Sequence, residues 1–120
     1  MEDFVSFEIA KKLKEKGFSL EKTEIYGKFD SDGLFHPQLY FNYIETMDYN
    51  EIDAPTISQV LKWLREEKKI HICVDFDGDM NWYYQIAIYG STDIAADGYG
   101  YNDYELSALA GIEYVLDNLI

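Results

Sequence analysis

The sequence predicts an α+β fold with the element order α-ββ-α-ββ-α, in which helices cover one face of a mainly antiparallel four-stranded sheet. Three observations predict it. Hydrophobic residues recur at helical spacing in three separate segments. Between these segments, two pairs of short runs read as strands. Each pair of runs is joined by an Asp-x-Asp-Gly string, at residues 30–33 and 75–78.

The first helix is predicted over residues 6–16. Ser6 is a favourable N-cap, and Gly17 can end the helix in the left-handed conformation that glycine adopts cheaply. Residues 24–29 and about 38–45 then predict two strands around the first Asp-rich turn. Residues 46–55 predict a polar connection to the central helix.

The clearest segment is residues 54–77, where a helix runs directly into a strand. Thr56 is a favourable N-cap, and Gln59 three residues later completes a capping box. The period changes from 3.6 to 2 at Ile70, which predicts a strand with alternating faces. The apolar helical stripe consists of Ile57, Val60, Leu61 and Leu64.

The last part of the chain predicts a strand, a loop and a helix. Residues 81–89 should pair with residues 70–77 as an antiparallel hairpin, because the connection is so short. Residues 90–102 are rich in Gly, Asp and Tyr and predict a long loop. Asn102 with Glu105 predicts the start of the final helix. Gly111 lowers helix propensity by up to about 1 kcal/mol, which indicates that another group approaches that side closely. The predicted apolar stripe is Leu106, Leu109, Ile112, Leu116 and Leu119.

Composition predicts a single domain over residues 1–120. The chain is 48% hydrophobic and 17% aromatic, which argues against disorder. The single Cys73 excludes an intramolecular disulfide and fits a reducing compartment. We expect no signal peptide and no membrane association, and therefore a cytoplasmic protein.

The charge of −13 is unevenly distributed. All ten basic residues lie between Lys11 and Lys69, whereas residues 70–120 contain nine acids and no base. Such a segment disfavours direct binding to nucleic acid, because phosphate contacts need Lys or Arg. It suits either solubility alone or attraction of a basic protein partner.

Two constellations suggest chemistry, and each has a simpler explanation. His71, Cys73 and Asp75 share one strand face, but residues two apart on a strand stand roughly 7 Å apart, too far for direct hydrogen bonds. Asp75, Asp77 and Asp79 resemble the start of a calcium loop and are candidate metal ligands. The glycine and the glutamate of such a loop are missing from their places, and an ordinary hairpin turn explains the Asp-Gly pair equally well.

The long loop and its exit combine tyrosines with acids and contain no base. This composition suits a surface that docks onto a basic partner, although the tyrosines could also fold back onto the sheet. The candidate partner-binding residues are Asp93, Asp97, Tyr99, Tyr101, Asp103 and Tyr104.

Three segments carry a resemblance to known sequences: VSFEIAKKLKEKGF, APTISQVLKWLREEKKIHI and ALAGIEYVLDNLI. Together they resemble a family of short uncharacterised proteins from bacterial genomes, especially those of gut bacteria, and their prophages or mobile elements. The resemblance covers about half of the chain. It implies a small intracellular accessory protein and no particular chemistry.

The leading functional hypothesis is a small non-enzymatic acidic protein that binds a basic protein partner, and a nucleic-acid decoy is one form of it. We expect no cofactor and no catalytic residue. One alternative is a small-ligand-binding or enzymatic domain with a pocket between sheet and helices. Another is a self-associating module, because the alternation places Tyr83 and Tyr89 on the sheet face opposite Trp82 and Ile88.

Overall fold

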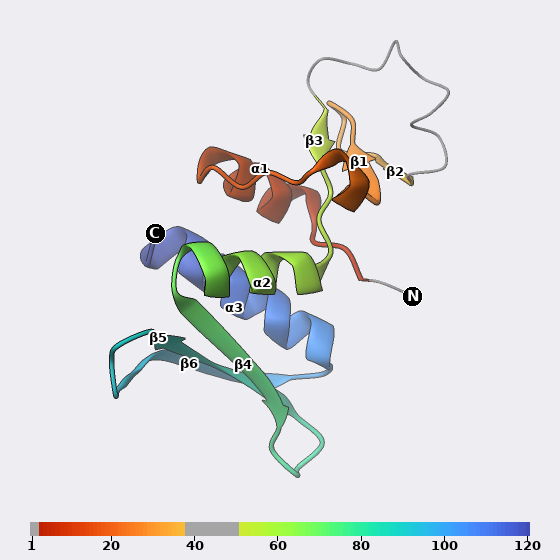
Figure 1. Ribbon diagram of the computed structural model, residues 1–120. Coiled ribbons are helices and arrows are strands. Elements are labelled where there is room, and N and C mark those ends of the chain that lie inside the picture. The colour runs from red at the N-terminus through yellow and green to blue at the C-terminus, as the bar shows by residue number, and fades with distance from the viewer. Residues whose placement is uncertain (1–2, 38–50) are drawn as a thin grey trace. The chain divides into compact units, whose positions relative to one another are not determined.

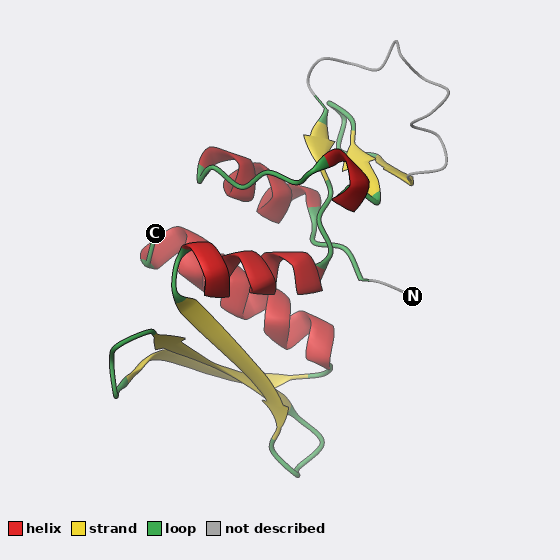
Figure 2. Cartoon of the chain, viewed as in Figure 1, coloured by secondary structure: helices red, strands yellow, loops and turns green. Residues whose placement is uncertain are grey.

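The computed structural model describes residues 3–37 and 51–120, and the chain divides into two compact units (Figure 1). Unit 1 extends to Thr56 and unit 2 begins at Ile57. Each unit contains a three-stranded antiparallel sheet and at least one α-helix (Figure 2). The α+β class is therefore confirmed, whereas the single four-stranded sheet is wrong. The prediction of one domain stays a prediction.

Unit 1 begins with helix α1 (Phe7–Glu15), which has the caps that the sequence predicts. The Ser6 hydroxyl accepts a hydrogen bond from the Ile9 N–H at 3.3 Å. At the other end, Gly17 has a φ of +88°. The Phe18 N–H donates to the Leu13 carbonyl at 3.0 Å, so a carbonyl of the last helical turn is hydrogen-bonded from beyond the helix end.

The sheet of unit 1 has the order β2-β1-β3. Its strands are β1 (Gly27–Phe29), β2 (Phe35–Pro37) and β3 (Ile52–Asp53), and a short 3-10 turn, η1 (Lys22–Glu24), precedes them. The expected first strand at 24–29 is therefore shorter, because Glu24 belongs to η1 and residues 25–26 precede the strand. The predicted polar connection at 46–55 was wrong at residues 52–53, which pair with β1. The predicted strand at 38–45 lies entirely outside the residues that the structure describes.

The two hairpin turns share a hydrogen-bond pattern. The Asp30 Oδ1 accepts from the N–H groups of Asp32 and Leu34, at 2.9 and 3.0 Å. In unit 2, Asp77 Oδ1 accepts from Asp79 and Asn81, at 2.8 and 3.4 Å. The aspartates of both strings thus organise turns, as side chains that mimic a backbone acceptor do.

Unit 2 starts with the helix–strand unit that the sequence predicts most clearly. Helix α2 (Ile57–Glu67) follows Thr56 directly, and its four predicted stripe residues are all buried. Strands β4 (Ile70–Phe76) and β5 (Trp82–Ile88) form the expected antiparallel hairpin. The buried side chains of this hairpin are those of Ile70, Ile72, Tyr84 and Ile86.

The prediction of a loop at residues 90–102 was wrong, because β6 (Ile94–Tyr101) is a strand. It pairs with β5, so the sheet has the order β4-β5-β6. Two irregularities interrupt the pairing, and Gly100 has a φ of +86°. Gly98 lies opposite Tyr84, and a Cβ placed there would meet the Tyr84 ring at 2.4 Å. The glycines that argued for a loop instead make room for an aromatic ring and a bulge.

Helix α3 (Tyr104–Asn118) starts one residue later than predicted. Asp103, not Asn102, is the N-cap, and its carboxylate accepts from the Leu106 N–H at 2.7 Å. The predicted stripe was partly wrong, because Leu106 is exposed and small residues occupy the buried side. A Cβ at Gly111 would come within 3.0 Å of the Ile72 side chain and 3.2 Å of the Tyr84 ring, which confirms the predicted close approach. The buried residues are Ser107, Ala108, Gly111, Ile112, Val115 and Leu116.

Candidate protein-binding face

The sheet of unit 2 has one covered and one helix-free face. Helices α2 and α3 lie on the same side of the sheet, as Figures 1 and 2 show. Residues that alternate with the buried ones must therefore point to the helix-free side. We call this side the open face, and its residues from the three strands are His71, Cys73, Asp75, Tyr83, Gln85, Ala87, Ile94, Asp97 and Tyr99.

Cross-strand pairs bring acids and tyrosines together on the open face. Asp75 lies opposite Tyr83, and Gln85 lies between Cys73 and Asp97. The rings of Tyr83 and Tyr99 stack, with centroids 5.3 Å apart and planes at 23°. The Tyr99 hydroxyl also reaches Asp97 Oδ2 at 3.4 Å. A stacked tyrosine pair thus lies beside carboxylates from two different strands.

The electrostatics of the open face follow from these neighbours. Partial removal from water raises the pKa of Tyr83, and the negative charges of Asp75 and Asp77 raise this pKa further. Tyr83 is a hydrogen-bond donor as well as an aromatic surface. A stacked aromatic pair beside carboxylates can hold a Lys or Arg side chain through both cation–π and ionic attraction.

The structure separates the six residues predicted to bind a partner. Asp97 and Tyr99 lie on the open face. On the covered side, the Tyr101 ring lies 5.9 Å from that of Tyr84, and Tyr104 meets Trp82 edge-on at 5.9 Å. Asp103 is engaged as the cap of α3.

The sixth residue, Asp93, lies in the turn before β6, where its N–H donates to the Ser91 hydroxyl at 3.3 Å. Asp75 and Gln85 are open-face residues that the predicted partner-binding set lacks. Their place on that face already follows from the period-two alternation of β4 and β5. Their association with Asp97 and Tyr99 depends on the pairing of β6, which the sequence does not reveal.

The candidate metal ligands and the candidate nucleophile do not come together in a site within the described residues. Within residues 3–37 and 51–120, no group of three or more His, Cys, Asp or Glu is arranged to hold a metal ion. His71, Cys73 and Asp75 are exposed along β4. Asp77 already accepts two backbone N–H groups in its turn. Asp75, Asp77 and Asp79 as ligands of a hard cation therefore remain a prediction.

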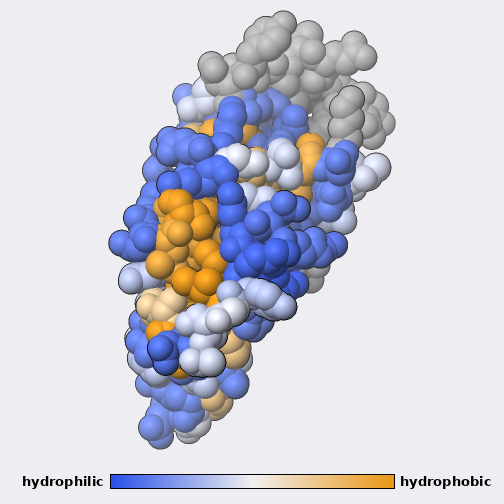
Figure 3. Space-filling view, turned by 60° about the vertical axis from the view of Figure 1, so that its left-hand side comes forward, coloured by the Kyte–Doolittle hydropathy of each residue, from blue (hydrophilic) through white to orange (hydrophobic). Residues whose placement is uncertain are grey.

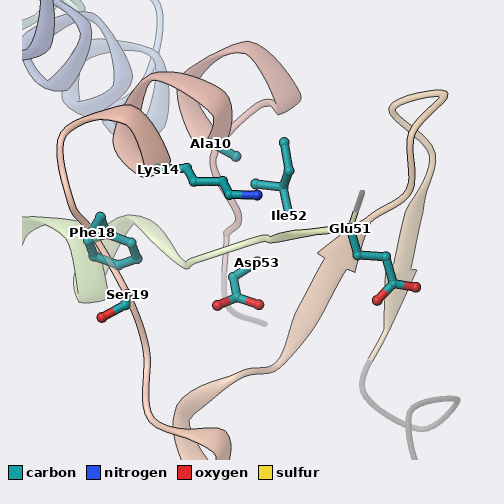
Figure 4. A pocket seen from close by; sticks show the side chains of 7 residues that line it. All are labelled: Ala10, Lys14, Phe18, Ser19, Glu51, Ile52 and Asp53. Carbon is teal, nitrogen blue, oxygen red and sulfur yellow. The ribbon is translucent and has the colours of Figure 1, made fainter. Parts of the chain in front are cut away.

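A small pocket lies in unit 1, between α1 and β3 (Figure 4). Burial raises the pKa of Asp53, while Lys28 and Lys14 oppose that rise. Lys28 Nζ lies 3.6 Å from Glu51 and 3.9 Å from Asp53. The cavity measures about 200 Å³, below the roughly 300–1,000 Å³ of typical small-molecule sites. Its lining residues are Ala10, Lys14, Phe18, Ser19, Glu51, Ile52 and Asp53.

Comparison with known proteins identifies no relative. The chain matches no protein-family model, no curated protein and no solved structure. The resemblance to short bacterial proteins consequently stays a prediction. In the described part of the chain, no helix has both the length and the apolar character needed to cross a membrane.

Proposed function

We propose that the protein is a non-enzymatic binding protein whose open face receives a basic segment of a protein partner. The observation that carries the proposal is the stacked Tyr83–Tyr99 pair beside Asp75 and Asp97 on a sheet face that no helix of unit 2 covers. Aromatic residues and acids in this arrangement complement Lys and Arg side chains.

The charge distribution of unit 2 supports the same partner. Its four bases all lie in α2 or within two residues of its end, and the sheet and α3 carry acids alone. The open face itself contributes no Lys or Arg, and Arg65 and Lys69 lie beyond its end near His71. Charge complementarity of this kind raises association rates and discriminates between partners more than it raises affinity.

An Arg-rich peptide titrated into the isotopically labelled protein tests the proposal. We expect amide shifts that concentrate on β4, β5 and β6 and that weaken with salt. Replacing both Asp75 and Asp97 by Asn removes two charges while it preserves hydrogen-bond acceptors. Exposed ion pairs contribute about 0.2–1 kcal/mol each, so the affinity should fall roughly two- to thirtyfold.

A matched control removes the same charge from another element. The variant with both Glu66 and Glu67 changed to Gln has the same net charge as the Asp75→Asn, Asp97→Asn variant, but its substitutions lie on α2. The proposal requires that this control bind the peptide like the wild type. Equal losses in both variants would show that the peptide responds to net charge alone, and the open face would then have no special role.

Self-association through the open face is a second candidate. Ile94 lies opposite Ala87 and is 52% exposed, and Tyr89 just beyond β5 is 85% exposed. Figure 3 shows one hydrophobic region of the surface bordered by hydrophilic residues, and this region is not assigned to the open face. Exposed apolar patches are typical of interaction surfaces. Sedimentation at high protein concentration separates the two candidates, since a monomer throughout would exclude self-association.

A further inference from the structure

A groove of about 420 Å³ lies at the end of the unit 2 sheet where β4 begins and β5 ends. Its volume falls within the range of small-molecule sites. The last turn of α2 and the residues after it provide Arg65, Lys69 and His71 on one part of the lining. The end of β5 provides Ile88 and Tyr89 on another.

The charge of this groove is opposite to that of the unit around it. Unit 2 contains eleven acids and four bases. Two of those bases line the groove, together with His71, and no Asp or Glu lines it. We propose that the groove binds a small anionic ligand, with its charged head beside Arg65 and Lys69 and a small apolar body against Ile88 and Tyr89.

The negative end of the α2 dipole repels an anion in the groove, so its charge must be compared with that of the two basic side chains. The C-terminus of a helix carries about half a negative charge. Arg65 and Lys69 supply two full positive charges, so the groove remains net positive. Lys69 Nζ donates to the Glu66 carbonyl at 2.9 Å, which satisfies part of the helix end and holds the ammonium beside the groove.

The apolar part of the lining predicts which anions bind best. Ile88 is 38% exposed and Tyr89 is 85% exposed, so each offers a surface for a ring or a short aliphatic chain. A bare inorganic anion contacts the cations alone. An anion with an attached ring also covers Tyr89 and Ile88, and it should therefore bind more tightly.

Three probes distinguish the contribution of the ligand's charged head group from that of its apolar body. They are inorganic phosphate, phenyl phosphate and benzoate. Binding is followed through amide shifts at millimolar concentrations. We expect saturable shifts around the junction of α2 and β4 and at the end of β5, with phenyl phosphate binding more tightly than inorganic phosphate. The rank of benzoate against phenyl phosphate then distinguishes a carboxylate head from a phosphate head.

Two sets of variants make the test specific. The double variant Arg65→Gln, Lys69→Gln should weaken phenyl phosphate about tenfold or more, because it removes two charge-assisted contacts. The control Lys62→Gln, Lys68→Gln removes the same charge from α2 and the residue after it, outside the groove, and should change affinity less than twofold. Tyr89→Ala should weaken phenyl phosphate and leave inorganic phosphate unchanged. Equal losses in the two double variants, or no saturable shift with any probe, would overturn the proposal.

Discussion

Gly98 offers the sharpest test of how the sheet of unit 2 is held together. A Cβ at this position would lie 2.4 Å from Cε1 and 2.7 Å from Cζ of Tyr84. Ordinary carbon contacts are about 3.5–4.0 Å long, so the ring would have to move by more than an ångström. Tyr84 has little space for that movement, because it is 5% exposed and its ring lies between Gly98 and Gly111.

The expected cost of Gly98→Ala follows from two opposing effects. Overpacking a filled core typically costs about 1–3 kcal/mol. Replacing glycine within a strand recovers roughly 0.5–1 kcal/mol of backbone entropy. The free energy of unfolding should therefore fall by about 1 kcal/mol, and by at most about 2.5 kcal/mol, which urea unfolding followed by circular dichroism can measure.

A double-mutant cycle shows whether the Tyr84 ring is the cause. In a Tyr84→Leu background the clash is absent, so Gly98→Ala should become neutral or stabilising. Gly100→Ala is the matched control, since Gly100 has a φ of +86° and no atom of the described residues lies within 4 Å of a Cβ placed there. Its cost should be the same in both backgrounds. A Gly98→Ala cost that is equally unaffected by Tyr84→Leu would refute the steric argument.

Three further predictions concern single side chains. The Ser107 hydroxyl is buried and has no hydrogen-bond partner among the described residues, so Ser107→Ala should raise the free energy of unfolding by about 1 kcal/mol or more; a loss in urea unfolding would show that the hydroxyl has a partner. Met80 has a φ of 68° and is 84% exposed, so Met80→Gly should raise the melting temperature, whereas Met80→Ala should not. Burial raises the pKa of Asp53 above 3.8, so its contribution to stability is full below pH 3.8 and is lost as pH rises through the raised value. Asp53→Asn should remove that loss from a pH series of unfolding curves, and an unchanged pH profile would contradict the assignment.

Local signals in the sequence predicted the helices and the β4–β5 hairpin. Ser6, Gly17 and Thr56 lie at helix boundaries, and alternation fixes which residues of β4 face the helices. These features depend on neighbours within a few residues. They are therefore visible without knowledge of the tertiary structure.

The wrong predictions for β3, β6 and the stripe of α3 share a different cause, because each depends on a distant partner. Gly98 and Gly100 lower the strand propensity of β6, but Tyr84 fills the space that Gly98 leaves. In α3, large leucines suggested a buried stripe, whereas the close approach of Ile72 and Tyr84 selects the side with Gly111. The open face depends on β6 too, so its six residues on β4 and β5 could be placed from the sequence, whereas the three on β6 could not.

The separation of charge within unit 2 has a kinetic consequence. Helix α2 and the two residues after it carry four bases and two acids, whereas the remainder of the unit carries nine acids and no base. This arrangement gives the unit a permanent electric dipole moment. In the field of a charged partner the unit experiences a torque before any contact is made, so collisions are no longer random in orientation. A cationic partner should meet the strands and α3 more often than α2, and this bias should disappear as the Debye length shrinks with added salt.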